Sequence, residues 1–207
     1  MHIELGYAFV PNGNTETAMP ATQTSIESLP AFRDRVDRFF LLLNQREIAI
    51  VAAVMHRAQS RPLSLIAHIT NTLCDGWIYG LLLLFLASLR EWRLTMVAAI
   101  GVVISFSFYF ATKPQFARIR PCNFDLSLQT KARCLDRYSF PSGHCMTFTA
   151  VAAVLCWQHH AIILPIACGL LLLSWARLAA AHHYPTDLIA GIGVGLSVGI
   201  PMAACLL

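Results

Sequence analysis

The chain contains apolar runs long enough to cross a lipid bilayer, and these runs limit the folds open to it. Residues 94–112 form a stretch of 19 residues without a formal charge. A helix of that length spans about 28 Å, close to the thickness of the hydrocarbon core of a bilayer. Hydrophobic residues make up 57% of the chain and charged residues only 13%, about half the charged share of soluble domains. The sequence therefore predicts an integral membrane protein.

Four further apolar runs are predicted to span the membrane. They cover residues 71–89, 143–157, 161–181 and 187–207. A sixth span is left open, because the apolar run 48–55 is too short unless its helix begins near Leu41. The fold class expected is all-α, a multi-pass transmembrane helical bundle of about five to six spans.

The chain divides into three predicted regions. Residues 1–30 are rich in Pro, Asn, Thr, Ser and Gly and predict a flexible tail, with no pattern typical of a cleaved signal peptide. Residues 31–61 contain apolar side chains at three- and four-residue steps, which favours an amphipathic interfacial helix and a possible first span. Residues 62–207 are predicted to form the membrane-embedded core.

Polar residues are expected to gather on one face of this bundle. Each span reverses the chain, so the long loop 113–142 and the short link 182–186 lie on the same side. Ionisable groups at membrane depth are costly and are functional by default. The residues placed on the shared face are Lys113, Arg118, Arg120, Ser142, His144, Arg177, His183 and Asp187. Several cations and two histidines near helix ends predict an anion-binding pocket.

The residue types in this pocket suit phosphate chemistry. Arginine offers a planar fork of donors that matches phosphate oxygens, and lysine adds a point charge. Ser142 and Gly143 supply a hydroxyl and a close backbone approach at a helix N-terminus, which favours anions. If helical, His183 and Asp187 share a face, so the carboxylate can hold one imidazole nitrogen and the other can attack phosphorus. His144, from another helix, can act as general acid.

Three motifs carry a family resemblance. Lys113-x6-Arg120-Pro121, then Pro141-Ser142-Gly143-His144, then Arg177-x5-His183-x3-Asp187 resemble in order and internal spacing the signature of the type 2 phosphatidic acid phosphatase superfamily, which also contains the vanadium haloperoxidases. The resemblance implies phosphate binding by Lys113, Arg120, Ser142, Gly143 and Arg177. It implies that His144 is the acid, that His183 forms a phosphohistidine and that Asp187 orients His183. It implies no metal and no other cofactor.

Several points stay open. The third motif begins Ala176-Arg177 where the family usually has Ser-Arg, which removes one possible hydrogen bond. Arg118 is as compatible with a headgroup contact as with a solvated charge, and Lys113 alone would be taken for a snorkelling residue at a span end. Asp75 and the glycine after it are interpreted as packing at the mouth of the bundle. A disulfide between Cys122 and Cys134 and two unpaired thiols have equal weight.

The predicted activity is hydrolysis of a lipid phosphate or diphosphate of the phosphatidate, phosphatidylglycerol phosphate or polyprenyl diphosphate type. The alternatives are a lipid phosphotransferase and, ranked lower, a non-catalytic lipid-phosphate transporter. A membrane lipid is the expected partner and nucleic acid is not, while the oligomeric state is left open. The resemblance implies a site on the extracytoplasmic side of a bacterial inner membrane. The positive-inside rule alone would place loop 113–142, with six Lys and Arg against two in 90–93, in the cytoplasm.

Overall fold

The computed structural model describes residues 23–128 and 137–207, with side chains from residue 33 onward. It divides into two units, Met1–Arg35 and Val36–Leu207. Helix α1 (Gln23–Arg57) begins in the first unit and continues into the second. Residues 1–22 of the predicted tail lie outside the described part of the chain. The fold and the site described below belong to the second unit.

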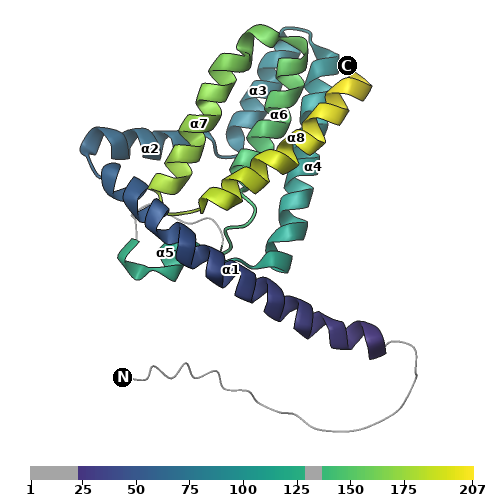
Figure 1. The fold of residues 1–207 in the computed structure, drawn as a ribbon. Helices are drawn as coiled ribbons and strands as arrows, with labels where there is room; N and C mark the ends of the chain where they lie inside the picture. The colour runs from purple at the N-terminus through teal and green to yellow at the C-terminus, as the bar shows by residue number, and fades with distance from the viewer. Residues whose placement is uncertain (1–22, 129–136) are drawn as a thin grey trace, which may run out of the picture. The chain divides into compact units, whose positions relative to one another are not determined.

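Helices make up the second unit. Those after α1 are α2 (Arg61–Leu73), α3 (Trp77–Ser88), α4 (Trp92–Phe116), α5 (Pro121–Phe124), α6 (Gly143–Gln158), α7 (Ile163–Ala179) and α8 (Pro185–Leu206), with single 3-10 turns at Leu126–Leu128 and His160–Ile162. The described residues contain no strand, only one isolated antiparallel bridge between Ile119 and Tyr138. Figure 1 shows α3, α4, α6, α7 and α8 running side by side as a bundle. The all-α fold class is confirmed.

The described residues contain four helical segments long and apolar enough to cross a membrane. They are Arg33–Arg57, Trp92–Phe116, His160–Ala179 and Pro185–Leu206. Helices α2 and α3 together form a fifth if they count as one span, although they meet at a bend of 62°. Helix α6, predicted as a span, has only 16 residues but packs against α4, α7 and α8 in the middle of the bundle. The open first span corresponds to the continuous helix α1.

A glycine stripe brings α8 into backbone contact with α6. Gly191, Gly195 and Gly199 recur every four residues along α8 and face α6. A methyl group at Gly195 would lie 2.5 Å from the carbonyl oxygen of Met146, and one at Gly199 would lie 2.4 Å from that of Ala150. Small residues at such spacing let membrane helices approach closely. This close van der Waals packing helps to hold the helices together, because the hydrophobic effect gives no driving force between helices in lipid. The stripe therefore sets the register of the two helices whose first turns carry Asp187 and His144.

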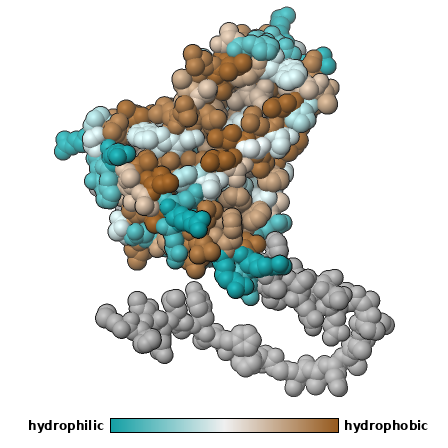
Figure 2. All heavy atoms as spheres, viewed as in Figure 1, coloured by the Kyte–Doolittle hydropathy of each residue, from teal (hydrophilic) through white to brown (hydrophobic). Residues whose placement is uncertain are grey.

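The side of the bundle is apolar, as expected for a surface in contact with lipid. Leu164, Leu171 and Phe110 have exposed fractions of 73%, 71% and 69%. In Figure 2 hydrophobic side chains cover much of the visible bundle, and hydrophilic ones gather near its ends. Exposed apolar area of this extent is unusual in a soluble monomer. It supports the prediction of an integral membrane protein.

Candidate active site

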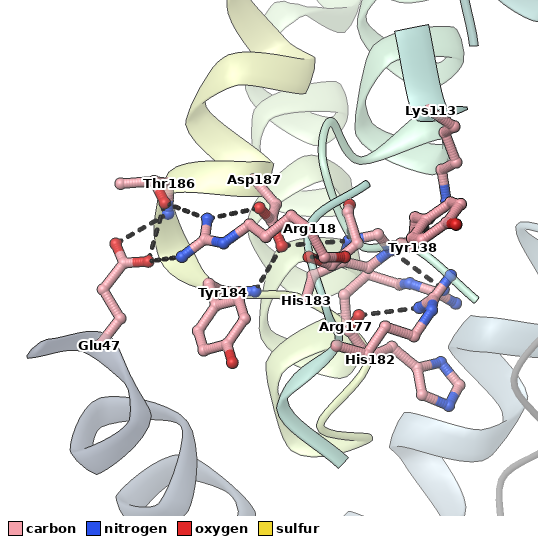
Figure 3. Close-up of polar contacts among 12 residues, drawn as sticks. Glu47, Lys113, Arg118, Tyr138, Arg177, His182, His183, Tyr184, Thr186 and Asp187 are labelled. Atoms are coloured by element: carbon pink, nitrogen blue, oxygen red, sulfur yellow. Dashed lines mark hydrogen bonds and ion pairs between the residues drawn. The ribbon is translucent and has the colours of Figure 1, made fainter. Parts of the chain in front are cut away.

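The three sequence motifs meet at one end of the bundle. Lys113 lies in the last turn of α4 and Arg177 in the last turn of α7. His144 is the second residue of α6, and Asp187 lies in the first turn of α8. His183 lies in the link between α7 and α8, beside Arg177 in Figure 3. The predicted gathering of polar residues on one face therefore agrees with the structure.

The end of α7 and the start of α8 turn His183 into the site. Helix α7 terminates with Ala181 in the left-handed region at φ 51°, and the N–H of His182 donates to the carbonyl of Arg177 at 3.2 Å. This pattern is a Schellman motif with alanine where glycine is usual. Pro185, three residues after His182, is the first residue of α8, a position for which its fixed φ is suited. The link is thereby kept short and rigid.

The segment just after α4 pairs with residues 137–139 and thereby places the backbone carbonyl of Ser139 next to His183. Helix α4 ends at Phe116, and its C-cap Ala117 is also in the left-handed region with φ 44°. The chain then turns back along residues 137–139, where the N–H of Ser139 donates to the carbonyl of Arg118 at 2.8 Å. The carbonyl of Ser139 in turn accepts from Nδ1 of His183 at 2.8 Å. A long loop is in this way tied to the short α7–α8 link.

These contacts decide the tautomer of His183. A carbonyl oxygen only accepts, so Nδ1 must carry the proton and Nε2 must carry the lone pair. Nε2 lies 3.4 Å from Nη2 of Arg177. Nδ1 lies 3.6 Å from Oδ2 of Asp187, farther than from Ser139. The expected shared helix face is not formed, because His183 precedes α8. Nδ1 nevertheless lies within ion-pair distance of Asp187, and its shorter contact is the one to the carbonyl of Ser139.

The surroundings of His183 keep its imidazole neutral. The side chain is 1% exposed. Burial lowers its pKa well below the ordinary value, and the positive charges of Arg120, Arg177 and Lys113 lower it further. A neutral ring with Nδ1 protonated presents an electron pair at Nε2, which is the state a nucleophile needs.

Asp187 is held by Arg118 and by the start of its own helix. Its Oδ1 accepts from Nη1 of Arg118 at 2.6 Å, and its Oδ2 accepts from the N–H of Tyr184 at 2.8 Å. Arg118 is 1% exposed and donates also to Asn44 at 2.8 Å and to Glu47 at 2.7 Å, both on α1. Arg118 thus lies in an ion-pair network behind Asp187 (Figure 3), which favours a role in holding that carboxylate over binding of phosphate.

The three other predicted phosphate-binding cations are buried around His183. Each donates a hydrogen bond within the protein: Lys113 Nζ to the carbonyl of Tyr138 at 2.7 Å, Arg120 Nη1 to the carbonyl of His182 at 2.8 Å, and Arg177 Nη1 to Oδ1 of Asn71 at 3.0 Å. Asn71 Nδ2 donates in addition to the carbonyl of Ala176 at 3.2 Å. The residue at the position of the usual serine is thereby tied to α2 through its backbone.

Ser142 and Gly143 form the start of α6 at the same place. The N–H of Ser142 donates to the carbonyl of Asp187 at 3.0 Å. Its Oγ is buried and has no hydrogen-bond partner within the described residues. A methyl group at Gly143 would lie 2.5 Å from the ring of Tyr109, so a larger residue there would force that ring to shift. Cys134 lies outside the described residues, so the bridge to Cys122 stays a prediction.

A cavity of about 370 Å³ opens beside His144. Most of its lining is apolar and comes from α3, α4 and α6, including Tyr79, Phe106 and Phe110. The catalytic candidates that line it are Gly143 and His144, together with Asp75, whose Oδ1 lies 3.3 Å from Nε2 of His144. The cavity therefore joins an apolar space to the polar end of the bundle.

Several residues of the site were not predicted. Asn44 and Glu47 hold Arg118, Asn71 holds Arg177, and Ser139 holds His183. A polar residue inside an apolar run was the available signal for Asn71 and for Glu47. The role of Ser139 is carried by its backbone, for which the sequence has no signal.

The chain is similar to known proteins in sequence and in fold. Residues 90–207 match the PAP2 superfamily. The chain is 28% identical over 158 residues to a decaprenylphosphoryl-5-phosphoribose phosphatase from Mycobacterium tuberculosis, an alignment that covers 74% of this chain and 86% of the relative. The fold of this chain is similar to that in the crystal structure of Aquifex aeolicus LpxE, with a TM-score of 0.64 and 20% identity. The similarity covers 76% of this chain and 94% of LpxE.

A second solved structure has the same fold. It is the transmembrane PAP2-type phosphatidylglycerolphosphate phosphatase from Bacillus subtilis, with a TM-score of 0.67 and 17% identity. The similarity covers 83% of this chain and 94% of the other. The PAP2 match takes in more than half of the chain, including the residues of all three motifs. The chain therefore belongs to the PAP2 superfamily and is a membrane-embedded phosphatase of that superfamily.

Proposed function

We propose that the chain hydrolyses a lipid phosphate or diphosphate through a phosphohistidine on His183, without a metal ion. The observation that carries this proposal is the state of His183. Its protonated Nδ1 is tied to the carbonyl of Ser139, so the electron pair at Nε2 points toward Arg177. A nucleophile with three buried cations around it is suited to a dianionic phosphate. The cations replace the charge neutralisation that a metal would supply.

The first half of the reaction forms the covalent intermediate. Nε2 of His183 attacks phosphorus, and the bond between phosphorus and the leaving oxygen breaks. His144 gives its proton to that oxygen, so the leaving group departs as an alcohol or, from a diphosphate, as a lipid phosphate. Lys113, Arg120 and Arg177 exchange their bonds within the protein for bonds to the three phosphoryl oxygens.

The second half releases phosphate. A water molecule attacks the phosphohistidine, and His144, now neutral, takes up the proton that the water loses. The bond between Nε2 and phosphorus breaks, and inorganic phosphate leaves. Asp187 lies 3.6 Å from Nδ1 of His183 and stabilises the positive charge that the ring carries in the intermediate. Arg118 keeps this carboxylate in place.

The apolar cavity beside His144 supports a substrate with a hydrocarbon chain. The relatives are named as phosphatases of a decaprenylphosphoryl sugar phosphate and of phosphatidylglycerolphosphate. Both names describe a phosphate carried on a lipid, and we extend that class to this chain. We also propose that the site faces the extracytoplasmic side of a bacterial inner membrane, as the family resemblance implies.

The test is a substrate panel with purified protein in detergent. Phosphatidate, phosphatidylglycerol phosphate, a polyprenyl diphosphate and a polyprenylphosphoryl pentose phosphate are assayed for released phosphate, with and without an acceptor lipid. Wild-type protein should release phosphate from at least one, and rapid quenching with a labelled substrate should trap a phosphohistidine that is stable in base and labile in acid. His183→Ala should do neither. Wild-type turnover by that variant, or a labelled acceptor lipid in place of phosphate, would overturn the proposal.

A further inference from the structure

A carboxylate at the break between α2 and α3 faces the proposed general acid. Asp75 lies in the short link before Trp77, at a bend of 62° between the two helices. Its Oδ1 lies 3.3 Å from Nε2 of His144. The N-cap of α3 is Gly76, so Asp75 lies one residue before the helix end. The contact joins a residue of the link to one 69 positions later in the chain.

The contact selects which nitrogen of His144 serves the substrate. With Nε2 directed at a carboxylate, which can only accept, Nε2 carries a proton and Nδ1 is the nitrogen left for a leaving group. The two side chains have exposed fractions of 17% for His144 and 39% for Asp75. Both line the 370 Å³ cavity. The pair is therefore placed where the leaving end of a bound substrate would lie.

The charges around His144 make such a partner necessary. His144 is largely buried, and the titratable groups that act on it electrostatically from neighbouring elements are Asp75, Arg120, Arg177 and His183. Two of these are permanent cations, which disfavour an imidazolium, and Asp75 is the only carboxylate among these four groups. A general acid must carry its proton before the bond to phosphorus breaks. Asp75 supplies the negative charge that opposes the two arginines.

We propose that Asp75 is a positioning residue that orients His144 and stabilises its protonated form for release of a poor leaving group. The proposal rests on the assignment of His144 as general acid made above. The proton on Nδ1 passes to the leaving oxygen as its bond to phosphorus breaks, and Nδ1 regains a proton from the attacking water in the second half of the reaction. Asp75 keeps its own charge throughout. A merely structural Asp75 would act equally on all substrates.

The experiment compares leaving groups. Asp75→Asn keeps the size of the side chain and one accepting oxygen but loses the charge. With dodecyl phosphate, whose leaving group is an alcohol, we expect kcat to fall about 10- to 100-fold, less than the ~100- to 10,000-fold that general acid–base catalysis supplies, while KM changes little. With 4-nitrophenyl phosphate, whose leaving group needs little protonation, we expect kcat within about threefold of wild type. The basic limb of the kcat profile for dodecyl phosphate should move to lower pH.

Two controls separate this inference from its alternatives. Asp125→Asn removes a carboxylate that accepts from the N–H of Ser127 outside the cavity, and it should leave both rates and the pH profile unchanged. In a His144→Ala background, Asp75→Asn should cause no further loss, since the carboxylate acts through the ring. Equal losses on both substrates, or an unmoved basic limb, would overturn the positioning role. Those outcomes leave the proposed function intact, because the proposed function is tested separately by the loss of phosphate release in His183→Ala.

Discussion

Replacing Arg118 tests whether this residue holds the site together or binds phosphate. Arg118→Met keeps most of the length of the side chain and removes the guanidinium. Two carboxylates, Glu47 and Asp187, then lose the cation that lies 2.7 Å and 2.6 Å from them. Breaking a buried ion pair costs about 3–5 kcal/mol, because an uncompensated charge stays behind. For a protein of this size each kcal/mol corresponds to about 2–4 °C in Tm.

The expected result is a Tm about 6–20 °C lower than that of wild type, measured by tryptophan fluorescence in detergent. Arg137→Met is the matched control, because Arg137 is exposed, and its Tm should stay within about 2 °C of wild type. Adding Glu47→Leu to Arg118→Met removes one of the two unpaired carboxylates. The double variant should therefore regain about 1–3 kcal/mol relative to the single variant.

Two results would refute this reasoning. The first is a Tm for Arg118→Met as close to wild type as that of Arg137→Met. The second is an unchanged Tm combined with weaker inhibition by orthovanadate, a phosphate mimic, because that combination is typical of a direct phosphate ligand. A fall in stability with an unchanged affinity for orthovanadate in the folded fraction agrees with the network behind Asp187.

Three further predictions concern packing, backbone conformation and pH. Gly195→Leu forces a side chain against the carbonyl of Met146 and should lower the free energy of unfolding by at least about 1–3 kcal/mol. Gly193→Leu is the control and should leave stability unchanged, because a side chain there meets nothing within 4 Å. Equal Tm values for the two variants would contradict the role of the stripe. Ala181→Gly relieves a left-handed alanine and should raise the Tm by about 2–4 °C; an unchanged Tm would show no strain. His183 has a lowered pKa in the folded state, so the unfolded state alone takes up its proton as the pH falls below about 6.5, and stability falls with it. His183→Gln should therefore lose less Tm than wild type between pH 7.5 and 5, and a parallel loss would contradict the assignment.

The helical fold and the gathering of the three motifs could be predicted because both follow from local patterns. Uncharged runs of membrane length indicate spans, and alternating spans place Lys113, His144 and His183 at the same end. The internal spacing of each motif is read directly from the chain. Such inferences need no knowledge of which side chains touch.

The partners of these residues could not be predicted, because they depend on packing between distant segments. Glu47 meets Arg118 across 71 positions, and Asp75 meets His144 across 69. No periodicity encodes either distance. The sequence alone indicates packing at the mouth of the bundle for Asp75, and for Arg118 it leaves a headgroup contact and a solvated charge open. The contact of Ser139 with His183 is made by a backbone carbonyl, which every residue type has, so the sequence cannot indicate it.

The glycine stripe on α8 also determines how the active site can admit a lipid. Since α6 and α8 touch through their backbones, the packing of the two helices fixes the separation of His144 and Asp187. The cavity lies beside α6 and is lined on its other sides by α3, α4 and the α2–α3 link. A lipid chain in the cavity would therefore contact these outer segments, including the bend before Trp77. The stripe thus fixes His144 relative to Asp187, whereas the contact of His144 with Asp75 depends on a segment that borders the cavity, so a bound lipid chain and the orientation of the general acid are coupled.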